Sequence, residues 1–273
     1  MDKETDTETA VLLMSTEPPA FEIVNPDGNS SAVLVCDHAS NRIPAKLGSL
    51  GLEPHQLAEH IGWDPGAADV ARGLSMHLDA PLLLSGYSRL VIDCNRPLHS
   101  KESIALQSAG VLIPGNRELT PEQRAIRVNT LFQPYHQAIE RILDERKLRP
   151  TALLSIHSFT PILNGQRRPW QIGVSHWRDA RLAALMVGEL VQSGDFLVGD
   201  NQPYPIDNIT DYTVPVHGEG RGLPSIMLEI RQDEIHTEAG AAACASRLAE
   251  SYRRIEAETL RLIAQCTKET ILK

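Results

Sequence analysis

Four short apolar runs in this chain of 273 residues end abruptly in polar side chains. The first covers Ala32 to Cys36, and it is followed by an acid, an imidazole, a hydroxyl and an amide (Asp37, His38, Ser40 and Asn41). Short runs rich in β-branched residues are typical of strands that are buried on both faces of a sheet. In open α/β folds, ligands bind in the crevice outside the carboxyl ends of such strands. The first run therefore predicts a buried strand over 32–37 that carries polar side chains to a binding crevice.

Three later runs repeat this design and supply further polar groups. They predict strands over 90–93, 152–157 and 224–230, which bring in Asp93, His157 and Glu229. A strand end that carries an acid or an imidazole is a natural place for ligand chemistry in this class of fold. We expect all four strand ends to converge on one metal-centred hydrolytic site.

Helical patterns separate the predicted strands. The clearest are an apolar face with four-residue spacing over 67–78, a capping box that opens a helix at Thr120, and helices over 180–191 and 238–264. The stretches 97–116 and 194–222 show no periodicity and are predicted as loops. This alternation predicts an α/β fold with a mostly parallel or mixed central sheet flanked by helices. Because no repeat or linker interrupts the chain, we expect a flexible tail over 1–19 and one domain over 20–273.

Charge and cysteine usage limit the class of partner. A net charge of -9 argues against nucleic acid or an anionic membrane surface as the main partner, although a local arginine cluster could still bind a small acidic substrate. The four cysteines show no spacing typical of a disulfide framework or a metal site, and Cys36 and Cys94 lie in apolar runs where thiols are inert. The polar amino terminus predicts no secretory signal, and no apolar run is long enough to span a membrane. We expect a cytoplasmic protein, and no feature of the sequence fixes its oligomeric state.

His38 and His157 are the first candidates for metal ligands. A neutral imidazole binds zinc, and a catalytic zinc site needs about three protein ligands and an open position. Asn41 and Asp64 are the alternatives for the third ligand, and Asp64 is preferred because a carboxylate neutralises more of the metal's charge than an amide oxygen. The competing interpretation is that both histidines are hydrogen-bonded core residues and that Asp64 only caps the following helix.

Glu229 lies inside an apolar strand, between Leu228 and Ile230. A carboxylate in such a place is costly unless it is paired or used in chemistry. Next to a metal-activated water it could accept a proton as a general base. The alternative is a buried ion pair with Arg231 or Arg96.

The segment that follows Asp93 carries candidates for substrate binding. Arg96 has the planar guanidinium that binds carboxylates through two hydrogen bonds, and Asn95 could add another donor. Asp93 could orient His38 or Arg96, and Asp37 is a possible neighbour of the metal ligands. Weaker candidates for substrate contact are Arg89, Arg221 and His217, of which His217 could donate to a developing oxyanion.

Taken together, these motifs resemble the N-formylglutamate amidohydrolase family over about 31–250. The resemblance rests on the segments Asp37–Pro44, Trp63–Asp64, Asp93–Pro97, Ile156–Phe159 and Leu228–Asp233. The family is distantly similar to zinc carboxypeptidases and aspartoacylase-like deacylases, which implies a zinc-exopeptidase-like α/β fold with a mixed sheet. Carried over by position, the resemblance implies His38 and His157 as metal ligands, Asn95 and Arg96 as the binding pair for a substrate carboxylate, and Glu229 as the base.

The chain departs from these relatives at two positions. Asn41 stands where the carboxypeptidase-like relatives have a glutamate ligand, which strengthens Asp64 as the third ligand. Many family members carry an acid shortly before the second histidine, and no such acid precedes His157 here, so its orienting partner is not identified.

The resemblance implies a specific activity. We expect a divergent amidohydrolase that uses zinc or another divalent transition metal to cleave a small N-acyl acidic amino acid such as N-formylglutamate. The alternatives are a deacylase or carboxypeptidase-like hydrolase of another acyl-amino acid or peptide, and a non-catalytic binding protein that has lost the metal.

Overall fold

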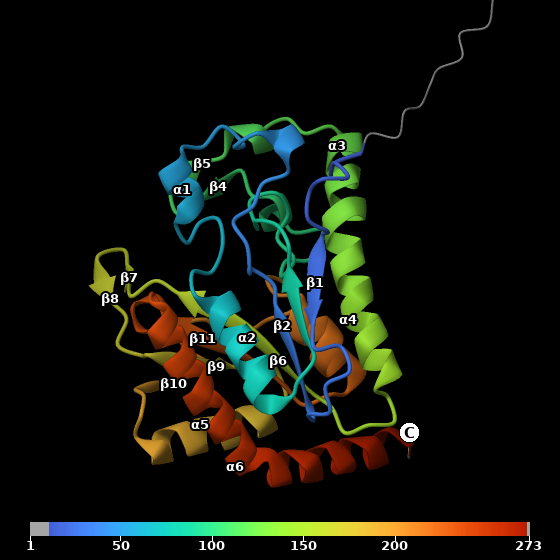
Figure 1. Ribbon diagram of the computed structural model, residues 1–273, viewed down its shortest axis with the longest axis vertical. Coiled ribbons are helices and arrows are strands. Elements are labelled where there is room, and N and C mark those ends of the chain that lie inside the picture. The colour runs from blue at the N-terminus through green and yellow to red at the C-terminus, as the bar shows by residue number, and fades with distance from the viewer. Residues whose placement is uncertain (1–10, 272–273) are drawn as a thin grey trace, which may run out of the picture.

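The computed structural model describes the backbone of residues 11–271 and the side chains of residues 11–264 (Figure 1). A seven-stranded sheet lies at its centre, in the order β1-β3-β2-β6-β11-β9-β10. Its strands are β1 (Phe21–Val24), β2 (Ala32–Cys36), β3 (Leu82–Ser85), β6 (Ala152–Phe159), β9 (Ile172–Ser175), β10 (Val198–Asp200) and β11 (Ser225–Arg231). The β1–β3 and β9–β11 pairs are antiparallel and the others are parallel, which confirms the predicted mixed sheet.

Helices cover both faces of the sheet because its central strands are apolar on both faces. They are α1 (Pro54–Ala58), α2 (Ala67–Leu78), α3 (Pro121–Arg127), α4 (Gln133–Glu145), α5 (Arg181–Ser193) and α6 (Glu238–Ile271). Leu34 and its neighbours on the same face of β2 pack against α2, α5 and α6, whereas Val33 and Val35 on the other face pack against α4. None of the helices in the described part of the chain is long and apolar enough to cross a membrane.

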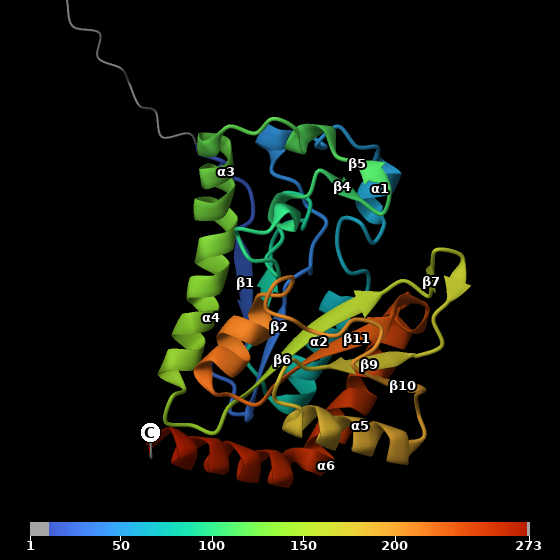
Figure 2. The same cartoon turned by 180° about the vertical axis from the view of Figure 1, so that it is seen from behind.

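The helix predicted from Thr120 is one rod that contains a single turn of π-helix. Thr120 and Gln123 form the predicted capping box, and a π-helical turn over Val128–Phe132 joins α3 to α4. Figure 2 shows α3 and α4 running on as one continuous helix. This turn lies directly before Pro134, which has no N–H to continue the α-helical hydrogen bonding.

A second, smaller core lies among the loops at the carboxyl ends of β2 and β3, near α1 (Figure 1). It includes Leu90, Val91 and Ile92, and the prediction of a strand over 90–93 is therefore wrong. The carbonyl groups of Leu90 and Val91 accept hydrogen bonds from the buried side chains of Asn116 and Arg127, so they have no need of a neighbouring strand.

Part of the predicted tail also packs on this core. Leu12 is buried, Glu17 accepts a hydrogen bond from the backbone N–H of Ala45, and the Pro18 carbonyl accepts one from the Tyr87 hydroxyl. The prediction of a loose tail is thus wrong for 11–19, and its remainder, 1–10, lies outside the described residues.

The predicted loops contain short regular elements. The stretch 97–116 forms a hairpin of β4 (Gln107–Ser108) and β5 (Val111–Leu112), and 194–222 contains β10 and a π-helical turn over Val214–Gly218. Another hairpin, β7 (Ile162–Leu163) and β8 (Gln166–Arg167), follows β6. These elements are too short to show a period in the sequence.

Candidate active site

A cavity of about 210 Å³ lies at the carboxyl ends of the parallel strands β2, β6 and β11. The residues that line it are His38, His60, Asp64, Arg89, Asn95, Arg96, His157, Ser158, Tyr204, Asp211, Met227 and Glu229. Most come from sites that the sequence singled out, and they arrive from segments that span almost 200 positions. Three of the four predicted strand ends, those that carry His38, His157 and Glu229, meet at this cavity, whereas Asp93 comes from a turn and does not line it.

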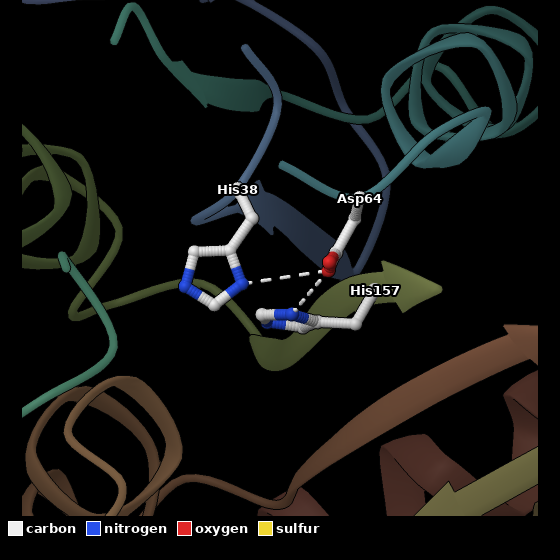
Figure 3. A group of neighbouring side chains, drawn as sticks. All are labelled: His38, Asp64 and His157. Carbon is white, nitrogen blue, oxygen red and sulfur yellow. Dashed lines mark hydrogen bonds and ion pairs between the residues drawn. The ribbon is translucent and has the colours of Figure 1, made fainter. Parts of the chain in front are cut away.

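His38, Asp64 and His157 form a buried group at one end of this cavity (Figure 3). One potential ligand atom from each lies within 4.8 Å of the others. Asp64 reaches the group because its backbone N–H donates to the His38 carbonyl at 2.9 Å. Its loop then turns into α2 through Gly66. This position requires glycine because its φ is 80° and because a Cβ atom there would lie only 2.5 Å from the Ile235 carbonyl oxygen.

A carboxylate orients the His38 ring. The Nε2 atom of His38 lies 2.7 Å from Asp93 Oδ1, and since a carboxylate only accepts, Nε2 carries the proton. The other nitrogen, Nδ1, has no hydrogen-bond partner and lies 3.4 Å from Asp64 Oδ2. A buried lone pair that faces a carboxylate oxygen is unfavourable unless a cation lies between them.

Asp37 holds His157 in the corresponding way. Its carboxylate lies 3.1 Å from His157 Nε2 and also accepts hydrogen bonds from the hydroxyls of Ser155, Tyr135 and Thr213. Burial alone would raise the pKa of Asp37, but His157 and the Thr213 hydroxyl outweigh it and hold this pKa well below its usual value. Asp37 is therefore the acid that orients His157 and that the sequence left unidentified. It directly follows β2, which lies beside β6 in the sheet.

The second nitrogen of His157, Nδ1, lies 2.9 Å from Asp64 Oδ2. Burial disfavours the charged ring, but the two flanking carboxylates outweigh it and raise the pKa of His157 to about 10. This location consequently favours positive charge strongly.

The donor set fits a divalent transition metal. Both histidines direct Nδ1 at the same Asp64 oxygen, while a buried carboxylate binds each Nε2, as is usual for metal-ligating imidazoles. Two imidazole nitrogens and one carboxylate oxygen form a three-ligand set of the kind found in catalytic zinc sites. The group could therefore hold a metal, whereas Asn41 is outside both this group and the cavity lining.

Glu229 faces the cavity from the centre of the sheet. In the register it lies beside His157 on one side and Gly173 on the other. It is only 5% exposed, and its Oε2 atom has no hydrogen-bond partner. Burial, with a further contribution from the charge of Asp64, raises the pKa of Glu229 to about 7.

The predicted alternative of a buried ion pair for Glu229 does not occur in the described structure. Arg231 pairs with Asp233 and Glu234 instead. Arg96 lies against Asp211 at 3.5 Å. Glu229 is thus a buried, unpaired carboxyl group with a pKa suited to proton transfer near neutral pH.

Asn95, Arg96 and Asp211, which come from loops, line another part of the cavity. Both hydrogen bonds that the Arg96 guanidinium forms with the described residues use Nη1, one to the Asn95 carbonyl and one to Asp211. The Asn95 side chain is buried and mainly structural, since its oxygen accepts from the N–H groups of Tyr212 and Thr213 and its nitrogen donates to Asp211.

Two sequence candidates lie outside the cavity lining. Arg221 is on the surface and forms an ion pair with Asp144. His217 is fully buried behind the site, where its Nε2 lies 2.9 Å from Nδ1 of His136, and burial lowers its pKa to about 3. Neither contributes a side chain to the cavity, because the segment 211–222 turns away from it after Asp211.

The structure adds residues that the sequence did not reveal. His60, Ser158, Tyr204, Met227 and Asp211 line the cavity without belonging to a predicted site, and Arg89, a weak candidate, contacts Asp64. Burial and the Arg89 charge lower the pKa of His60 to about 4. The one signal available in the sequence was the position of His60, four residues before Asp64.

Comparisons with known proteins agree with this site and fold. A family model described as N-formylglutamate amidohydrolase matches residues 30–236. A solved structure from Agrobacterium tumefaciens is 35% identical with a TM-score of 0.84, over 95% of this chain and 99% of that chain. N-formylglutamate amidohydrolase from Ralstonia eutropha JMP134 shares the fold at 18% identity and a TM-score of 0.67, over 92% of this chain and 100% of that chain.

A search of curated proteins finds no match. The family model nevertheless covers most of the chain, and it includes every residue of the cavity lining. The chain therefore belongs to the N-formylglutamate amidohydrolase family and is a hydrolase that acts on linear amides.

Proposed function

We propose that this chain is a zinc-dependent amidohydrolase that cleaves a small N-acyl acidic amino acid, with N-formylglutamate as the first substrate to test. One observation carries the proposal. Two histidines and an aspartate direct ligand atoms at one another in a buried group, and an unpaired glutamate lines the same cavity. A hydrolase needs this combination of a metal-activated water and a proton acceptor.

His38, Asp64 and His157 would hold the metal, and the metal would supply a Lewis acid that acidifies water and polarises the acyl carbonyl. Asp93 and Asp37 keep the two imidazole rings in orientation through Nε2. Arg89 bonds Oδ1 of Asp64, which leaves Oδ2 directed at the histidines.

Glu229 would move the proton. Its carboxylate accepts a proton from the attacking water and later returns it to the nitrogen of the leaving amino acid. The free oxygen of Glu229 and its pKa of about 7 suit both steps, because a group with a pKa near the working pH can accept and donate in turn.

Arg96 would hold a carboxylate of the substrate. Its Nη2 and Nε atoms form no hydrogen bond with the described residues, so two parallel N–H groups are available for a carboxylate. Asp211 and the Asn95 carbonyl fix the guanidinium through Nη1, which leaves its other N–H groups to bind an acidic group of the substrate.

The decisive experiment combines metal analysis with a substrate panel. We expect the purified protein to contain about one zinc per chain and to hydrolyse N-formyl-L-glutamate or another N-acyl acidic amino acid faster than the same acyl group on leucine. The His38→Ala variant should lose the metal and the activity together. Short peptides and N-acetyl amino acids in the panel identify a deacylase or carboxypeptidase-like activity if the formyl compound is not the preferred substrate.

A protein that binds no stoichiometric metal and hydrolyses none of these amides would overturn the proposal. Equal rates on the acidic and the leucine substrates would leave the metal chemistry standing but remove the role of Arg96.

A further inference from the structure

His60 borders the metal-binding group but has no part in the mechanism above. It lies four residues before Asp64, and its Nδ1 atom is 3.3 Å from Asp64 Oδ1. Its side chain lines the cavity and is 24% exposed. The ring therefore touches both the metal-binding group and the space that a substrate would fill.

A chain of hydrogen bonds behind the ring determines how its partner is oriented. The Ser158 hydroxyl donates its one proton to the Pro65 carbonyl at 2.9 Å. The hydroxyl can then only accept a hydrogen bond from the Gln232 side chain, 3.2 Å away. This places the NH₂ group of Gln232, and not its carbonyl oxygen, between Ser158 and His60.

The orientation of Gln232 in turn fixes the proton on His60. The Gln232 nitrogen lies 2.9 Å from His60 Nδ1, and an amide NH₂ group donates but cannot accept. Nδ1 must therefore carry the lone pair, and the proton of the neutral ring is on Nε2. The other neighbour of Nδ1 is Asp64 Oδ1 at 3.3 Å, and the Arg89 guanidinium that bonds this oxygen supplies the positive charge that offsets its repulsion of the Nδ1 lone pair. Nε2 has no hydrogen-bond partner among the described residues, so it is the ring nitrogen of this cavity-lining residue that is available to a substrate.

We propose that His60 Nε2–H donates a hydrogen bond to the acyl oxygen of the substrate as negative charge develops on it, and that Gln232 and Ser158 are positioning residues that keep the proton on Nε2. The assignment rests on the proposed amide hydrolysis. The acyl carbon must lie against the His38–Asp64–His157 group and within reach of Glu229, and His60 is the neutral donor beside that group. A donor that is already oriented before reaction stabilises the transition state without reorganising.

The first test separates the donor from the ring. We expect His60→Ala to lower kcat by about 100-fold, as the loss of one oxyanion donor does, with KM and zinc content close to those of the wild type. The His60→Gln variant retains an N–H donor at a similar distance and should recover much of the loss. His55→Ala, which removes an exposed histidine on α1, is the matched control and should leave kcat unchanged.

The second test moves the proton of His60 from Nε2 to Nδ1 while the imidazole ring stays in place. In Gln232→Glu, a carboxylate faces Nδ1 and draws the proton to it, so Nε2 becomes an acceptor and kcat should fall about as far as in His60→Ala. Two-bond ¹H–¹⁵N correlation spectra of the zinc-loaded protein read the tautomer directly. We expect the Nε2–H form of His60 in the wild type and the Nδ1–H form in the variant, with the His60→Gln spectrum assigning the signal.

Each outcome decides one part of the proposal. An Nδ1–H tautomer in the wild type overturns the relay, and a kcat for His60→Ala within about threefold of the wild type overturns the donor role. Loss of zinc in His60→Ala overturns it as well, since the residue would then act on the metal site. If the wild type hydrolyses no amide, the proposed function and the donor role fail together, while the spectra still decide the relay.

Discussion

The two sides of the cavity are built by different means. His157 and Glu229 come from the adjacent parallel strands β6 and β11, where the sheet register places them side by side. Arg89, Asn95, Arg96 and Asp211 come from loops on the other side, where hydrogen bonds and ion pairs between side chains hold them. The strand side is fixed by the backbone, and the loop side by its own polar groups.

This difference separates the two tasks of the site. His157 and Glu229 are at most 5% exposed, whereas the side chain of Arg96 is 25% exposed. Chemistry that needs an exact geometry and a dry surrounding is suited to the strand side, and recognition of a charged substrate is suited to the loop side. Substitutions on the strand side should therefore change kcat or metal affinity, and substitution of Arg96 on the loop side should change KM.

The largest effect is expected from Glu229→Gln, a substitution on the strand side. We expect kcat to fall by about 1000-fold because the amide cannot accept a proton, while zinc content stays at the wild-type level. Stopped assays with N-formyl-L-glutamate and metal analysis of the same sample measure both quantities. Wild-type turnover in this variant would remove Glu229 from the mechanism.

Asp37→Asn tests the strand side by changing the carboxylate that holds His157. The asparagine can no longer hold the imidazole as a charged acceptor, so zinc affinity should fall by about 10- to 100-fold. Competition with a chelator measures the affinity. Tyr135→Phe removes one of the donors to the same carboxylate and should have a much smaller effect, and equal affinities in all three proteins would contradict the role of Asp37.

Arg96→Ala tests the loop side. The loss of a charge-assisted hydrogen bond is worth roughly 1.5–3 kcal/mol, so KM for an acidic substrate should rise about 10- to 100-fold while kcat changes little. Arg96→Lys keeps the charge but loses the planar fork and should lie between the two. A drop confined to kcat would place Arg96 on the chemical side of the comparison.

Low pH should weaken the buried pair of histidines, His136 and His217, that supports the loop side. His136 Nε2–H donates to the Cys94 carbonyl, beside Asn95, and its Nδ1 accepts from His217. Burial lowers the pKa of His136 to about 4 and that of His217 to about 3, below the value of about 6.5 expected in the unfolded chain. Both are therefore neutral in the folded protein, and their contribution to stability is complete above pH 6.5 and is lost as the pH falls towards 4.

The free energy of unfolding should consequently decrease by up to about 1.4 kcal/mol per pH unit for each histidine in that range. Urea unfolding of the wild type and of His217→Leu at several pH values separates the contribution of the histidine pair from that of the carboxylates. The same slope in both proteins would show that the pair does not carry this dependence.

The smallest effect is expected outside the cavity. Arg221 was a sequence candidate for substrate contact, yet it pairs with Asp144 on the surface, where ion pairs contribute less than about 1 kcal/mol. Arg221→Ala should leave kcat and KM unchanged and lower stability only slightly. A rise in KM comparable to that of Arg96→Ala would show that the loop side extends further than the cavity does.

The sequence predicted the strand side much better than the loop side. An apolar run that ends in a polar residue is a local signal, so it points to His38, His157 and Glu229 individually, without knowledge of the fold. The resemblance places the orienting acid of His157 just before it in the chain. The structure instead supplies Asp37 from the neighbouring strand, and only the strand order reveals that the two residues are close.

The loop side depends on tertiary contacts that leave no local pattern. Leu90 and Val91 resemble a strand, but buried Asn116 and Arg127 satisfy their carbonyl groups and keep them in a turn. Asp211 lies in a stretch predicted only as a loop, and its role is set by Asn95, more than 100 positions earlier.

Strand β11 is last in the sequence but lies between β6 and β9 in the sheet. During folding, β9 and β10 can pair only with each other until this final strand has entered, so the sheet depends on contacts between distant parts of the chain and should form slowly. The same strand delivers Glu229. A chain in which β11 has not yet entered lacks Glu229 at the cavity, so we expect hydrolytic activity only after this strand is in place.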